Sequence, residues 1–173
     1  FHFYYQTFDR CAWKILLFVR SLEPGVDHAC ISSGGDVEAG RKLFMRTGDC
    51  STCHTVGMEG GRLGPDLSNA GATYTRSQIH DALLDPNKKI ATGHRTVKVV
   101  SHAGNSYEGI LLNEDAYSLH MMSRDEEIHS FMKQNLASFQ RLNQSLMPAY
   151  SFFPEVKLKN LTAYLCSLGK TRQ

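Results

Sequence analysis

Five consecutive residues constrain this chain more than any other stretch: Cys50-Ser51-Thr52-Cys53-His54. Two thiols separated by two residues and followed at once by an imidazole are the attachment signature of a c-type haem. Each thiol can add to a vinyl group of the porphyrin, and the imidazole can bind the iron. Zinc sites and dithiol enzymes also use this cysteine spacing, but zinc needs a second ligand pair and a dithiol enzyme needs no adjoining histidine. No second such pair occurs in the sequence. The motif therefore predicts one covalent haem, with a chance match as the alternative.

Helical patterns lie on both sides of this motif. The preceding helix can be capped by Asp36 and ends near Gly48. Its apolar face consists of Val37, Gly40, Leu43 and Phe44. Farther on, Thr75 and Gln78 have the spacing of a capping box, and the helix that they begin ends at Asp85-Pro86.

A last helix is expected near the end of the chain. It begins near Pro154-Glu155, where proline suits the first turn, and ends at Gly169. Its apolar side consists of Val156, Leu158, Leu161, Ala163, Tyr164, Leu165 and Leu168.

Two further segments complete a resemblance to the class I cytochrome c family: Gly64-Pro65-Asp66-Leu67 after the motif, and Ser145-Leu146-Met147-Pro148 before the last helix. The resemblance implies that Pro65 accepts a hydrogen bond from His54 and that Leu67 packs on the porphyrin. It implies that Met147 is the sixth ligand of the iron, opposite His54. The first and last helices then cross, with Gly40 and Phe44 against Leu161, Tyr164 and Leu165.

The sixth ligand decides what the iron can do. A histidine and methionine pair raises the reduction potential and leaves no open coordination position, so the expected function is electron transfer. The other methionines are expected to be packing residues: Met45, Met58, Met121, Met122 and Met132. A histidine in place of Met147 would lower the potential. The alternatives are His80, His94, His102, His120 and His129, all expected on the surface or in strands.

The period of the apolar residues changes between the haem motif and Met147. Alternation predicts four strands in an antiparallel meander, inserted at about residues 94–133: 96–102, 107–111, 116–123 and 128–132. With this insertion, residues 36–170 resemble the strand-inserted haem-binding domains of acidobacteria and planctomycetes. Such domains often accompany propeller-type dehydrogenases. The expected fold class is mainly α, a class I cytochrome c helical fold around one haem with the meander inserted.

The first 34 residues are expected to form an extension, and residues 35–173 the cytochrome c domain. Within the extension, residues 13–22 are predicted to form an apolar helix stopped by Pro24-Gly25, and a linker rich in glycine and serine follows. Three cysteines remain outside the motif. A disulfide between Cys11 and Cys30 is one pairing that an oxidising compartment would allow, and Cys166 is expected to be a small core residue.

Composition and charge limit the classes of partner that this chain can bind. The 173 residues are 42% hydrophobic, enough for a core, and a formal net charge of +2 argues against nucleic acid. No apolar run approaches the ~20 residues that a membrane helix needs. Because the sequence neither begins with Met nor carries a signal peptide, we expect a mature or trimmed form. The resemblance to class I cytochromes c implies haem attachment outside the cytoplasm, and therefore an export signal or anchor that has been removed.

These observations predict a monohaem electron carrier rather than an enzyme. It would be periplasmic or otherwise extracytoplasmic, working alone or as a subunit of a larger membrane-associated redox or photosynthetic complex, with redox proteins such as a periplasmic dehydrogenase as partners. Two alternatives stay open: a haem enzyme or gas sensor with a labile sixth ligand, and a structural docking subunit.

Overall fold

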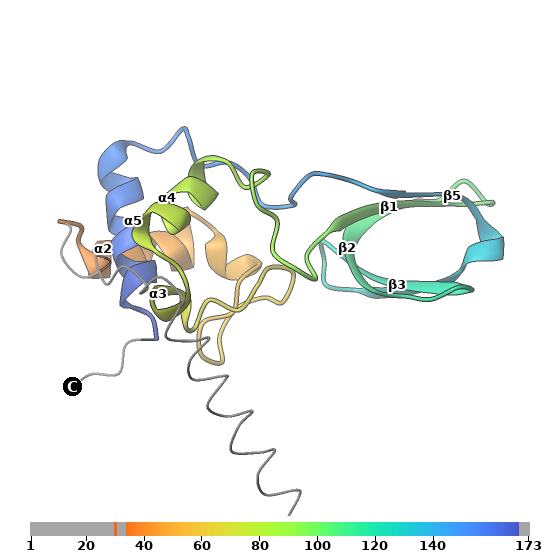
Figure 1. Cartoon of the computed structure of the whole chain (residues 1–173), viewed down its shortest axis with the longest axis horizontal. Coiled ribbons are helices and arrows are strands. Elements are labelled where there is room, and N and C mark those ends of the chain that lie inside the picture. The colour runs from red at the N-terminus through yellow and green to blue at the C-terminus, as the bar shows by residue number, and fades with distance from the viewer. Residues whose placement is uncertain (1–29, 31–33, 170–173) are drawn as a thin grey trace, which may run out of the picture.

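The structure is a computed structural model that describes residue 30 and residues 34–169. The predicted helix at 13–22 and Cys11 lie outside the described residues. Figure 1 shows the helices gathered at one end of the molecule and the strands extending from it at the other. No helix among the described residues is long and apolar enough to span a membrane.

The helical part follows the expected local signals. Helix α2 spans Val37–Lys42, and the Asp36 carboxylate accepts hydrogen bonds from the first turn; the chain continues as a π-helical turn, Leu43–Thr47. Helices α3 and α4 span Ala70–Thr73 and Arg76–Leu84. The capping box of Thr75 and Gln78 is present at the start of α4. Helix α5 spans Glu155–Ser167.

The crossing of α2 and α5 explains why glycine stands at position 40. A Cβ on Gly40 would collide with the backbone oxygen of Asn160 and lie 2.8 Å from Cβ of Tyr164. One turn later, the rings of Phe44 and Tyr164 lie with their centroids 5.5 Å apart, and Leu161 is fully buried beside them. The expected contact between the first and last helices is confirmed, and it forms the core of the helical part.

The prediction of a mainly α fold is wrong, because the chain builds a large antiparallel sheet of five strands. These are β1 Thr96–Ser101, β2 Ser106–Glu114, β3 Ser118–Ser123, β4 Ile128–Met132 and β5 Leu136–Arg141. Their order is β4-β3-β2-β1-β5. The expected meander is present as β1 to β4, and the unexpected β5 returns to pair with the free edge of β1.

A bulge explains why alternation did not reveal β5. Val100 pairs with Ser138 but Ser101 pairs with Leu136, so Ala137 is an extra residue in the ladder. In a regular strand, Leu136 and Phe139 would point to opposite faces, since they are three residues apart. The bulge turns both toward the same core.

The sheet has a hydrophobic core of its own. Val97 and Val99 of β1 and Leu119 and Met121 of β3 are fully buried together, and the sheet curves around them (Figure 1). We call residues 96–141 the β lobe. A separate small cluster joins this lobe to the helical part: Leu63, Ile110 and Met122, with Cys53 and Leu146 packed against them.

The cysteine pairing differs from the pairing considered from the sequence. Cys30 forms a disulfide with Cys166 rather than with Cys11. Cys166 is buried in the core, as expected, and is in addition bonded to Cys30. Sequence spacing could not show this pairing, because 136 positions separate the two residues and only the fold brings them together.

Candidate haem-binding site

The two cysteines of the motif lie on one tight turn. Residues Cys50–Thr52 form a single 3-10 turn, and the amides of Cys53 and His54 both donate to the carbonyl of Cys50, at 3.2 and 2.9 Å. Asp49 enters this turn with a left-handed φ of 52°. Both motif thiols are free, Cys50 buried and Cys53 half-buried. The turn thus offers two reduced sulfurs and an imidazole from neighbouring positions.

Burial affects both thiols in the same direction. It raises the pKa of Cys50 to about 11, and the pKa of Cys53 is raised by burial and by the nearby charge of Asp49. Redox dithiols and zinc ligands depend on thiolates, which lowered pKa values favour. The raised pKa values favour the protonated form of both thiols at neutral pH.

The imidazole of His54 is held in one tautomer. Its Nδ1 lies 2.8 Å from the carbonyl oxygen of Pro65, which is the hydrogen bond expected from the sequence. With Nδ1 donating, Nε2 keeps the lone pair that can bind a metal. Burial lowers the pKa of His54, so the neutral imidazole is favoured. Two free thiols and this oriented imidazole form a donor set that fits a haem attached through sulfur.

Gly64 lies directly against the imidazole of His54. A Cβ at this position would be 2.6 Å from Cε1 and 2.7 Å from Nδ1. The loop returns to the motif here, because the amide of Gly64 donates to the carbonyl of Cys53 at 2.7 Å. Leu67 then packs against the helical core that contains Cys50. Glycine at position 64 therefore allows the Pro65 carbonyl to approach the imidazole.

Replacement of Gly64 by alanine is expected to push the imidazole away from Pro65. The haem-loaded variant should show an altered absorbance spectrum and a free energy of unfolding lower by about 1–3 kcal/mol, as for other overpacked sites. Met58→Ala is the control, since this side chain is fully exposed on the same loop. Absorbance spectra and chemical denaturation of both variants measure the effect. A wild-type spectrum and stability in Gly64→Ala would contradict the proposed contact.

Met147 lies on an irregular segment, residues 142–153, which we call the strap. The strap is tied to the end of α4 and the loop after it, because the amide of Tyr150 donates to Leu83 O and that of Ser145 to Asn87 Oδ1, both at 2.8 Å. Met147 is half-buried and packs against the same core as Cys50 and Leu67. Its role as a ligand stays a prediction.

Tyr150 links the strap to the haem motif, a role that could not be inferred from the sequence. Its hydroxyl donates to the carbonyl of Gly48 at 2.6 Å and lies 3.9 Å from the sulfur of Cys50. Burial raises the pKa of Tyr150, so the hydroxyl stays protonated. Three aromatic residues follow Met147 closely, and nothing in their order distinguishes Tyr150 as the one that reaches Cys50.

The competing ligands occupy different surroundings. Met121 and Met122 are buried in or beside the β lobe, whereas Met58 and Met132 are exposed. Met45 packs on the helical core and remains near the site. Among the alternative histidines, His94 is the one whose charge contributes to the lowered pKa of His54.

The fold brings together a donor set that fits a covalently attached haem. Residues 37–120 are similar to the family model described as Cytochrome c, and this match to a cytochrome c domain supports a c-type cytochrome. Such a domain implies covalently bound haem c. The match includes the haem motif and Pro65 and ends before the strap that carries Met147. No curated protein matches the chain.

Proposed function

We propose that this protein is a monohaem c-type cytochrome that carries single electrons between redox proteins. The observation that carries the proposal is the hydrogen bond from His54 Nδ1 to Pro65 O beside two free motif thiols. When bound, the haem supplies a one-electron couple between ferric and ferrous iron. Cys50 and Cys53 would hold it through thioethers, and His54 would bind the iron through Nε2.

The chain's own residues fit the needs of an electron carrier. Pro65 fixes the tautomer and direction of His54, so the ligand does not reorient when the charge of the iron changes. Met147 is our candidate for the sixth ligand, held half-buried by the strap. Leu67 and the buried helical core would exclude water, which limits the solvent rearrangement that accompanies electron transfer.

A disulfide supports a proposal about where in the cell this carrier works. A disulfide between Cys30 and Cys166 is typical of proteins in oxidising compartments. We therefore propose a periplasmic or other extracytoplasmic location, with redox proteins or a larger membrane-associated complex as partners. The strand-inserted architecture supports placing the chain with the acidobacterial and planctomycete domains that it resembles.

The defining experiment is a redox titration of the haem-loaded chain. We expect an intact mass larger by one haem and a single one-electron transition, with a slope of about 59 mV per decade. Carbon monoxide should not bind to the reduced protein, because an electron carrier with two protein ligands has no open position. Tight binding of carbon monoxide would favour the gas sensor or enzyme, and a haem that does not change oxidation state in an isolated complex would favour the docking subunit.

A further inference from the structure

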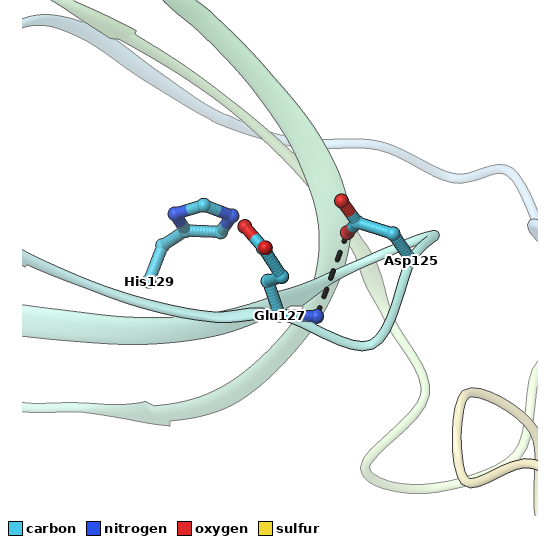
Figure 2. A group of neighbouring side chains, drawn as sticks. All are labelled: Asp125, Glu127 and His129. Carbon is cyan, nitrogen blue, oxygen red and sulfur yellow. Dashed lines mark hydrogen bonds between the residues drawn. The ribbon is translucent and has the colours of Figure 1, made fainter.

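The turn between β3 and β4, residues 124–127, contains several internal hydrogen bonds and lies next to the proposed haem site. Figure 2 shows Asp125, Glu127 and His129 grouped there, and their ligand atoms lie within 4.8 Å of one another. Hydrogen bonds within the hairpin account for this grouping. Ser123 Oγ lies 2.5 Å from Asp125 Oδ1 and 2.9 Å from His129 Nε2, and both acidic residues are exposed. We therefore place no metal ion there; these bonds stiffen the turn.

Glu126 points from this turn onto the loop that follows the haem motif. Its Oε1 accepts a hydrogen bond from the amide of Arg62 at 2.5 Å, and its Oε2 lies 3.8 Å from Arg62 Nε. The side chain is 29% exposed. A Cβ on Gly61 would be 2.7 Å from the same Oε1 and would collide with the carbonyl of Thr52 in the motif. Glu126 therefore packs against the loop that contains Gly61, and this loop packs against the turn of the haem motif.

The backbone of Glu126 is held in an uncommon conformation. Its φ of 64° lies in the left-handed region, which costs a residue with a Cβ about 1–2 kcal/mol. Among the described residues, the other non-glycine residue with a positive φ is Asp49, directly before Cys50. Such conformations persist where the surrounding structure fixes them, and they gather at functional sites. Both of these residues border the haem motif.

Arg124, two residues before Glu126, contacts the strap that carries Met147. Its Nη1 lies 3.5 Å from the carbonyl oxygen of Leu146, the residue before Met147. Leu146 and Cys53 both pack into the small cluster that joins the β lobe to the helical part. Arg124 therefore lies beside the cluster that contains Cys53, and Glu126 contacts the loop that packs on Thr52, the residue before Cys53. The β3–β4 turn therefore contacts the loop that follows the haem motif through Glu126, and the strap through Arg124.

We propose that Arg124 and Glu126 tune the reduction potential from the Cys53 side of the haem, and that Glu126 also positions the loop at Arg62. This inference rests on the proposed function. Uptake of one electron from a donor protein lowers the charge of the site by one unit. A nearby positive charge favours the reduced state and a nearby negative charge opposes it. Arg124 raises the potential, and Glu126 lowers it.

The test uses charge-neutralising variants of the haem-loaded protein. Glu126→Gln keeps an amide oxygen that can accept from Arg62, so it isolates the charge, and it should raise the midpoint potential. Arg124→Gln should lower it. At a fixed electrode potential, the ratio of reduced to oxidised protein should change roughly two- to fivefold in each case, and less at high salt. Glu127→Gln is the matched control. It removes the same charge from the same turn but leaves the contact between Glu126 and the loop that follows the haem motif in place.

The positioning role has a readout of its own. Glu126→Ala removes the acceptor, so hydrogen exchange at the Arg62 amide should speed up, whereas Glu126→Gln should leave it slow. The tuning would be overturned if Glu126→Gln and Arg124→Gln shifted the midpoint potential in the same direction. It would also be overturned if neither variant shifted the potential more than Glu127→Gln does. Unchanged exchange in Glu126→Ala would overturn the positioning. A wild-type chain without covalent haem would instead refute the proposed function, and that result appears before any variant is compared.

Discussion

Replacing both Cys50 and Cys53 with serine is expected to abolish covalent attachment of haem. The two thiols are free and lie on one tight turn beside His54, and a serine hydroxyl cannot form a thioether. Under denaturing conditions the variant should have the mass of its polypeptide, whereas the wild-type chain should be heavier by one haem. Intact mass spectrometry measures this difference directly. Cys50→Ser alone should leave one thioether or none.

A second pair of cysteines provides the matched control. Replacing Cys30 and Cys166 with serine removes two sulfurs as well, but these form the disulfide that anchors α5. This control should keep the covalent haem and lose about 2–5 kcal/mol of stability. Retention of covalent haem by the Cys50 and Cys53 double variant would refute the assignment of the motif.

Replacement of Met147 by alanine is expected to have the second largest effect. Loss of a thioether ligand removes a group that favours ferrous iron, so the midpoint potential should fall by on the order of hundreds of millivolts, within the ~0.8 V range that axial ligands span. The strong-field spectrum should also be lost. Potentiometric titration and absorbance spectroscopy measure both changes. Met58→Ala is the control, because that methionine is fully exposed and should leave both properties unchanged.

His94 is the residue to examine if Met147→Ala keeps the wild-type spectrum and potential. His94 is half-buried and acts electrostatically on His54, unlike the histidines of the β lobe. In that case His94→Ala should change the spectrum, and the wild-type potential should be low, as expected for two histidine ligands. The two single variants therefore distinguish the candidate ligands.

Features set by neighbouring residues could be predicted from the sequence. The cap at Asp36, the capping box at Thr75 and the first four strands are all present. Each depends on hydrogen bonds or side-chain periodicity within a few positions, which a linear pattern records. The close crossing at Gly40 could also be anticipated, because a missing side chain one turn before Phe44 marks a place for another helix.

Other features depend on partners far apart in the chain. The fifth strand escaped prediction because the bulge at Ala137 breaks its alternation. The Cys30 and Cys166 disulfide joins segments at opposite ends of the described chain. Tyr150 and Glu126 acquire their roles only where the strap and the β3–β4 turn reach the haem motif. Nothing in their local sequence distinguishes them from other aromatic or acidic residues.

The spacing of the motif residues limits what their side chains can bind. Two thiols and an imidazole at fixed spacing admit few uses, because bond lengths and the geometry of one turn limit what such groups can hold. The fold sets the surroundings of these side chains. It places one carbonyl against His54 and one tyrosine against Cys50, and it brings charges of the β lobe near Cys53. Those contacts form between segments that pack together only after folding, so burial and distance in space, rather than order in the chain, set them.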